Sequence, residues 1–230
     1  MPALRQLTND SYSREFIRLA WKGYSRELDE KYGFAYALEW YIESNLVDAL
    51  EFKVLNASTC LELLMDKFNS EQKSEYILNS EFSDKFKDKL QICFSKELKG
   101  LGIEDKEIRK SIYANLGGIN RRSYVDKAYN LLSYWGISYD DIDMGFEDTV
   151  RVRDQITHRG KYYSKNADIR TEFEDVLKAY KSLAMILPRI FLAMLNFEGQ
   201  YLDTISGGWI QFKEVCNRRR FKVRLRFTNR

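Results

Sequence analysis

Apolar residues recur at intervals of three and four positions along most of the chain, which is the period of an amphipathic α-helix. The longest such stretch covers residues 34–69 and predicts either one helix or two helices joined near Asn56. The same period returns over residues 82–98, 121–135 and 168–197. Only two prolines occur in 230 residues, which favours long helices. We therefore predict an all-α fold.

Near the C-terminus the pattern changes to an alternation of apolar with polar or basic residues, which is the period of a β-strand. It covers residues 209–212 and 221–227, with a turn at residues 217–220. We expect a short basic β-hairpin-like appendage. Residues 209–230 carry eight Lys or Arg and one Glu, a net charge of +7. Such a segment can bind a nucleic-acid backbone. It can also form the edge of a sheet that is completed by another chain or by a further domain, and the sequence leaves these three possibilities open.

These patterns divide the chain into three parts. Residues 1–32 are expected to form an N-terminal helical extension, residues 33–199 the helical domain and residues 200–230 the basic β tail. In the extension, Phe16 and Leu19 alternate with basic residues, as in an amphipathic helix that packs against a domain.

The composition narrows the class of protein. Hydrophobic residues make up 44% of the chain and charged residues 31%, which is typical of a soluble domain. No apolar stretch approaches the roughly 20 residues needed to cross a bilayer, so we expect no membrane association. The three cysteines are far apart and odd in number, which is typical of reduced thiols in a cytoplasmic protein. With a single histidine, a zinc site is not expected, and we predict no metal and no cofactor.

An acidic stretch, Asp140, Asp141 and Asp143, precedes the next predicted helix. Its spacing is not the Asp-x-Asp-x-Asp-Gly of a calcium loop. We interpret it as the N-cap and turn before a helix that runs from about Gly145 to Arg159.

That helix contains the only histidine, His158. In a helix, Asp154 and His158 lie one turn apart on the same face, so the carboxylate can accept a hydrogen bond from the imidazole and fix its tautomer. Arg153 lies beside them, and its permanent charge suits the phosphoryl oxygens of a phosphodiester. An imidazole suits proton transfer at neutral pH. The predicted catalytic residues are therefore Arg153, Asp154 and His158.

Further cations crowd the same window and recur in the tail. We assign these cations to RNA binding: Arg151, Arg159, Lys161, Arg218, Arg219 and Arg220. In the alternative interpretation, His158 only interacts with the dipole at the end of its helix.

The stretch from Arg153 to His158 resembles the pattern of HEPN domains, in which Arg, a polar residue and three variable residues precede His. Residues 37–44 and 55–64 are similar to the first long helices of ApeA-type HEPN proteins. The resemblance extends over residues 35–198 and implies an antiparallel helical bundle. It also implies a metal-independent endoribonuclease of the prokaryotic defence or toxin type, which leaves a 2′,3′-cyclic phosphate.

HEPN domains pair so that two motifs face one groove, and the resemblance therefore implies a homodimer with a composite active site. The chemistry agrees, because attack by a 2′-OH needs a base and an acid while one chain supplies one histidine. Glu62, within the similar region, is a further candidate to face that groove. The expected partners are RNA, a second copy of the chain and an antitoxin or other defence-system protein.

Two other functions stay open from the sequence. The chain can be a non-catalytic nucleic-acid-binding or sensor module of a defence system, in which the motif holds a phosphate without cleaving the strand. It can also be a scaffold, in which the motif only ends a helix.

Overall fold

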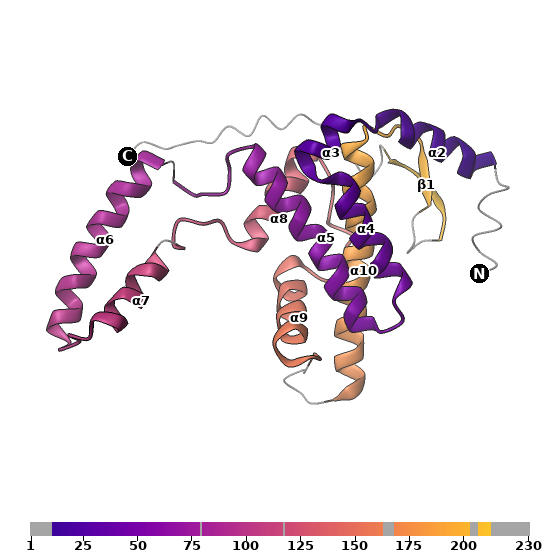
Figure 1. The fold of residues 1–230 in the computed structure, drawn as a ribbon. Helices are drawn as coiled ribbons and strands as arrows, with labels where there is room; N and C mark the ends of the chain where they lie inside the picture. Colours follow the sequence, from indigo (N-terminus) through magenta and orange to yellow (C-terminus); the bar gives the residue numbers. More distant parts are fainter. Residues whose placement is uncertain (1–10, 79, 117, 163–167, 203–206, 213–230) are drawn as a thin grey trace.

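The computed structural model describes residues 11–78, 80–116, 118–162, 168–202 and 207–212. This part of the chain contains nine α-helices and one small two-stranded antiparallel sheet near its C-terminal end (Figure 1). The predicted all-α fold with a short β appendage is therefore confirmed.

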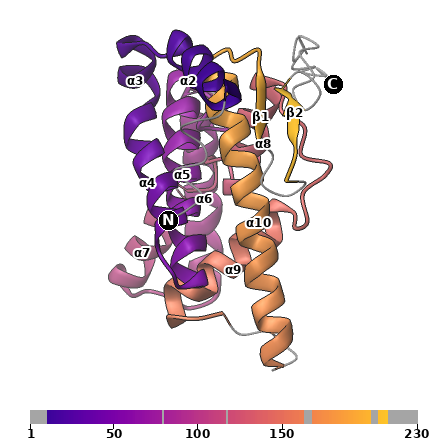
Figure 2. The same ribbon diagram turned by 90° about the vertical axis from the view of Figure 1, so that its right-hand side faces the viewer.

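Five helices form the central bundle: α4 Phe34–Leu46, α5 Leu50–Glu71, α8 Tyr124–Trp135, α9 Phe146–Arg159 and α10 Ile169–Met194. α5 lies at the centre and packs against the other four, while α10 also packs against α4, α8 and α9. Figure 2 shows α10 running the length of the bundle, and the helix passes through Pro188 without a break. Buried apolar side chains from all five helices, Leu61 and Ile186 among them, make one core.

The stretch over residues 34–69 forms two helices, and their junction is not at Asn56. α4 ends at Leu46, and Val47 and Ala49 have extended backbone conformations before α5 begins. The side chains of Ser44 and Asn45 both donate to the carbonyl oxygen of Tyr41, at 2.7 Å in each case. Such side chains compete with the backbone ladder, which accounts for the helix end at this point. Asn56 lies inside α5.

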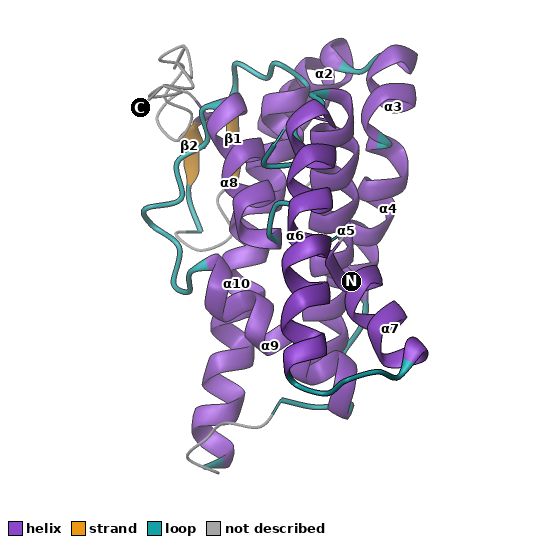
Figure 3. Cartoon of the chain, turned by 90° about the vertical axis from the view of Figure 1, so that its left-hand side faces the viewer, coloured by secondary structure: helices purple, strands orange, loops and turns teal. Residues whose placement is uncertain are grey.

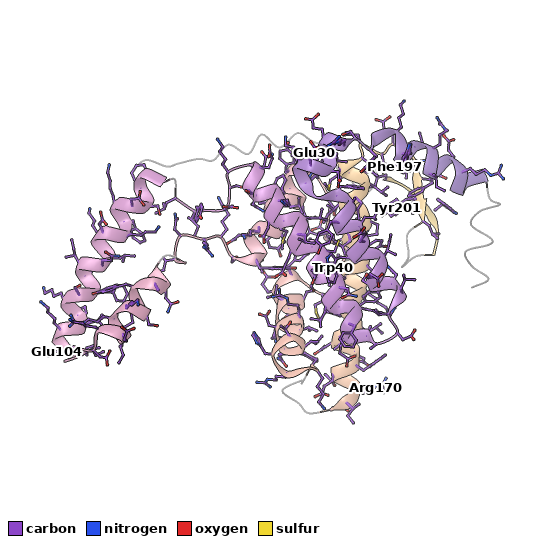
Figure 4. The ribbon with its side chains drawn as sticks, in the orientation of Figure 1. Glu30, Trp40, Glu104, Arg170, Phe197 and Tyr201 are labelled. Carbon is purple, nitrogen blue, oxygen red and sulfur yellow. The ribbon has the colours of Figure 1, made fainter. Side chains whose placement is uncertain are left out.

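Two short helices precede the bundle: α2 Ser11–Gly23 and α3 Arg26–Tyr32. α3 begins at the N-cap Ser25, whose hydroxyl accepts from the amide of Leu28, and it packs on α4 and α5. α2 lies across the C-terminal end of α10, where the rings of Phe16 and Phe197 pack in a tilted arrangement with centroids 5.1 Å apart. Figure 4 shows Phe197 and Tyr201 at this end of the bundle.

Strands β1 Gln200–Leu202 and β2 Trp209–Gln211 pair antiparallel, with Tyr201 opposite Ile210. The strand predicted at residues 209–212 is therefore confirmed over Trp209–Gln211. Its partner is β1, which the sequence pattern did not predict, because three residues are too few to display a period. The predicted turn at 217–220 and the strand at 221–227 lie outside the described residues.

The acidic stretch does not supply the N-cap of α9, and this part of the prediction was wrong. The N-cap is Gly145, which has no side chain with which to cap the helix. Asp141 instead accepts two hydrogen bonds, at 2.7 and 2.6 Å, from the guanidinium of Arg189. Arg189 is fully buried in α10 and also donates to the Ser138 carbonyl and the Tyr201 hydroxyl. The acidic stretch thus neutralises a buried cation.

The remaining helices, α6 Ser80–Gly100 and α7 Lys106–Leu116, form a hairpin that projects from the bundle (Figure 1). We call residues 80–116 the arm. Each of its helices packs mainly on the other, and Glu104 marks the turn at its far end (Figure 4). At the base of the arm, the Asn120 amide donates to the Leu78 carbonyl and accepts from the Leu78 amide. These two hydrogen bonds join the chain segments that lead into and out of the arm.

Candidate functional site

α9 carries the candidate motif, and the helix predicted from about Gly145 to Arg159 is confirmed as Phe146–Arg159. Glu147 and Asp148 lie in its first turn, while His158 and Arg159 lie in its last, so both sets of charges complement the helix dipole. The helix stops at Gly160, which has φ 75° and donates its amide to the Ile156 carbonyl. A left-handed conformation of this kind favours glycine.

The buried stripe of α9 determines where the motif side chains lie. Val152 and Ile156 are buried against α5 and α10. Arg153 and Asp154, which follow Val152 around the helix, fall at the edge of this contact and are partly buried. His158 lies on the solvent side and is exposed.

Arg153 is the centre of a small charged cluster. Its guanidinium forms an ion pair with Glu62 of α5 and donates to the Asp154 carboxylate at 2.9 Å. The ring of Tyr124, in the first turn of α8, lies 6.0 Å from the guanidinium carbon. Burial opposes the charge on Arg153, but the hydrogen bond that Arg153 donates to Asp154 and the charges of both carboxylates outweigh it and raise the Arg153 pKa.

Glu62, which the resemblance made a candidate to face the groove of a paired site, contacts the motif through this ion pair within one chain. Burial, and next the nearby Glu62 carboxylate, raise the pKa of Tyr124 well above its usual range, so the phenol stays neutral. No sequence signal pointed to Tyr124, because its place depends on how α5, α8 and α9 pack.

The contact predicted between Asp154 and His158 is not formed, so this prediction was wrong. The Asp154 carboxylate accepts from Arg153, while His158 makes no hydrogen bond or ion pair to any described residue. A guanidinium is always charged, and a charge-assisted hydrogen bond is stronger than one from a neutral imidazole. The three predicted catalytic residues are therefore split, with Arg153 and Asp154 in the cluster and His158 apart on the surface.

The predicted RNA-binding cations differ in their surroundings. Arg151 is exposed and pairs with Asp148 at 3.1 Å. Arg159 and Lys161 are exposed at the end of α9, and within the described residues Arg159 has no hydrogen-bond or ion-pair partner. The other three predicted cations, Arg218, Arg219 and Arg220, lie outside the described residues.

Just beyond the helix end, the chain is anchored by Tyr162. The Tyr162 ring is buried, and its hydroxyl donates to the Asp175 carboxylate of α10 at 2.8 Å. Burial, together with this acidic neighbour, raises the pKa of Tyr162. The exposed His158–Arg159 pair is thereby held at a fixed place beside the N-terminal end of α10.

These surroundings set what the site can do. The Arg153 cluster contains one cation and two carboxylates, so an incoming phosphate has to displace a carboxylate before it can reach the guanidinium. Among the described residues, Arg159 at the exposed end of α9 has no such competitor. Among the described residues, no group of three His, Cys, Asp or Glu is placed to hold a metal ion. No helix in the described part is long and apolar enough to cross a membrane.

Comparison with known proteins assigns the family. A family model described as the YopA C-terminal domain matches residues 29–215, which is most of the chain. Searches of curated proteins and of solved structures found no match. The resemblance to HEPN domains was wrong, since the matching family is a different one. Two residues, Arg and His, at a fixed separation in a helix occur often by chance, and here Arg153 is tied to Glu62. The chain belongs to the YopA C-terminal domain family.

Proposed function

We propose that this protein binds single-stranded RNA through the exposed cations at the C-terminal end of α9, without cleaving it. The observation that carries the proposal is the state of Arg159, which is exposed and has no intramolecular partner among the described residues. His158 beside it is also exposed, and its side chain has no partner among the described residues. An exposed arginine without an intramolecular partner among the described residues is suited to phosphate oxygens, which dominate affinity for nucleic acids.

Binding is favoured over cleavage because of the Arg153 cluster. In a nuclease of the kind expected from the sequence, Arg153 stabilises phosphate charge and Asp154 orients the imidazole. In this protein both side chains are engaged with each other, and Arg153 is also engaged with Glu62. An arginine held by two carboxylates is a structural contact rather than a preorganised phosphate donor.

The basic C-terminal tail adds to the proposal from the sequence alone. Its excess of positive charge suits a polyanion, and it supplies Arg218, Arg219 and Arg220 as further candidate contacts. An antitoxin or other defence-system partner stays a prediction of the sequence.

A second candidate function is metal-independent RNA cleavage by a homodimer. The observation in its favour is the exposed and unpaired imidazole of His158, which is available to a strand or to a second copy of the chain. Two copies with their α9 ends together bring two histidines to one strand, as a base and an acid. Light scattering at tens of micromolar that shows only monomer, with cleavage retained, contradicts the composite site.

One experiment separates the two functions. The purified chain is incubated with a labelled single-stranded RNA in excess EDTA, while anisotropy reports binding and a denaturing gel reports strand length. We expect salt-sensitive binding and intact RNA. A 2′,3′-cyclic phosphate product that disappears in His158→Ala establishes cleavage instead, and no binding at low salt refutes both functions.

A matched pair of variants tests the place of binding. Arg159→Gln should weaken binding, because it removes a cation from the proposed contact. The control is Arg14→Gln on α2, which removes an arginine that is also exposed and unpaired among the described residues. Equal affinities for the two variants contradict the assignment to α9.

A further inference from the structure

The arm presents one side of α6 to solvent, on the side away from the bundle. In Figure 1, α7 lies between α6 and the bundle, and in Figure 3, seen from the arm side, α6 stands in front of the other helices. The bundle therefore does not cover the outer side of α6.

Contacts between the two arm helices define the inner side of α6. Ser83 and Leu98 are buried, and Leu90 and Phe94 are half-buried. The Ser95 hydroxyl is hydrogen-bonded to the Tyr113 hydroxyl of α7 at 2.6 Å. These contacts fix the rotation of α6 about its axis, so the opposite face is also fixed.

The opposite face carries lysines and apolar side chains together. Successive helix residues are about 100° apart, so one sector of about 120° holds seven side chains, all of them exposed. These residues, which we call the outer face of the arm, are Phe82, Lys85, Phe86, Lys89, Ile92, Cys93 and Lys96. The sector contains no acidic residue, and Phe82 is 60% exposed and Ile92 72%.

We propose that the outer face of the arm is a second contact surface for single-stranded RNA; this rests on the proposed RNA-binding function. The three lysines extend along about 16 Å of the helix axis, a length that suits several phosphates of one strand. Phe82 and Phe86 lie one turn apart on the same face. Exposed aromatic rings beside lysines are the combination that binds single strands, because bases stack on the rings while the backbone follows the cations.

The placement of the lysines favours RNA over a membrane or a second copy of the chain. In a helix that lies in a bilayer surface, the apolar side chains form the centre of the buried face and the lysines flank it. Here Lys85, Lys89 and Lys96 form one continuous stripe, with Ile92 on one side of it and Phe82, Cys93 and Phe86 on the other. Inserting this face into lipid buries the lysines, and pairing it with a second copy brings like charges together.

The test compares two triple variants of the full chain. One, Lys85→Gln/Lys89→Gln/Lys96→Gln, removes the lysines of the outer face. The control, Lys67→Gln/Lys178→Gln/Lys181→Gln, removes three exposed lysines of the bundle with the same change in net charge. Affinity for a single-stranded RNA is measured by anisotropy over a range of salt concentrations.

We expect the arm variant to bind about tenfold or more weakly at low salt, with a salt-dependence slope smaller by about 2, and the control to resemble the wild type. Phe82→Ala should weaken binding without changing that slope, because stacking releases no counterions. If the wild type binds RNA and the two triple variants bind it equally well, the inference about the arm is wrong while the proposed RNA-binding function stands. If the wild type binds no RNA, the proposed function fails first.

Two further measurements test whether RNA contacts the outer face itself and whether that face binds a membrane instead. RNA should slow the alkylation of Cys93, which lies on the outer face, and should not do so in the arm variant. Vesicles of equal parts phosphatidylcholine and phosphatidylserine serve as the membrane probe. An arm variant that loses vesicle binding and keeps full RNA binding overturns the proposal.

Discussion

At the scale of single residues, two arginines organise the polar contacts between elements. Arg189 is buried in α10, and its donors are satisfied by Asp141, the Ser138 carbonyl and the Tyr201 hydroxyl. A buried guanidinium is tolerated only when it is paired in this way. Arg189 therefore ties the connection before α9 and the strand β1 to the same helix.

Removal of the carboxylate that faces Arg189 should destabilise the fold. We expect Asp141→Asn to lower the free energy of unfolding by about 2–3 kcal/mol, because it leaves a buried cation without its counter-ion. Asp143→Asn is the control, since Asp143 is an exposed neighbour with no described partner, and it should cost less than about 0.5 kcal/mol. Urea unfolding of the three proteins at neutral pH measures both, and equal midpoints contradict the role of Asp141.

The same pair predicts a dependence on pH. The hydrogen bond from Arg189 holds the pKa of the Asp141 carboxyl below its ordinary value in the folded state. The carboxylate therefore contributes stability above its unfolded pKa of about 4, and this contribution is lost as pH falls through the lower folded value. The difference in stability between wild type and Asp141→Asn should shrink in acid, and a difference that grows instead has the wrong sign.

The separation of Arg153 from His158 gives a further prediction about single residues. Arg153→Ala leaves two carboxylates together without a cation, and we expect a loss of about 1–2 kcal/mol in the free energy of unfolding. His158→Ala removes an exposed, unpaired side chain and should change stability by less than about 0.5 kcal/mol while it weakens RNA binding or cleavage. Thermal melts and RNA assays on the same preparations test this, and parallel losses of stability in both variants show that His158 is structural.

At the scale of elements, the close approach of α2 to α10 depends on one glycine. A Cβ atom added at Gly23 would lie 1.8 Å from the carbonyl oxygen of Leu195, so a larger residue forces the two backbones apart. We expect Gly23→Ala to lower stability by about 1–3 kcal/mol, the usual range for overpacking. The control is Gly100→Ala at the end of α6, where nothing lies within 4 Å of the added atom. Unfolding midpoints that rise for both variants mean that α2 does not dock as described.

The same elements show what a sequence pattern can and cannot predict. The period of three and four identified α8 and α10, because one side of each helix is buried in a common core. It also identified α6, yet it gave no sign that Phe82 and Ile92 stay exposed on a projecting arm. An apolar stripe looks the same in a sequence whether it packs into a core or is exposed to solvent. The sequence pattern gave no sign of the Glu62–Arg153 ion pair, since its partners come from separate helices.

At the scale of the whole molecule, charge is unevenly distributed. The net charge is +3, and residues 213–230 carry +7 of it, so the preceding 212 residues sum to −4. An RNA strand is therefore repelled by much of this protein and attracted by local groups of cations, which are the α9 end, the outer face of the arm and the tail. This distribution favours several separate contacts over one continuous basic surface.

Truncation tests the contribution of the tail, and the structure decides where the cut belongs. Phe212 is buried, its ring 6.2 Å from Phe197 and 5.9 Å from Tyr201, and β2 pairs with β1. A chain that ends at Gly207 loses this packing, so we expect its Tm to fall. A chain that ends at Phe212 keeps the packing of Phe212 and the pairing of β2, and it lacks the basic segment 213–230. It should melt like the wild type and bind RNA more weakly, with a salt-dependence slope smaller by about 0.7 for each lost phosphate contact. Melting curves and binding at several salt concentrations give both quantities for the two truncations, and an unchanged slope in the chain that ends at Phe212 assigns the tail to protein contacts.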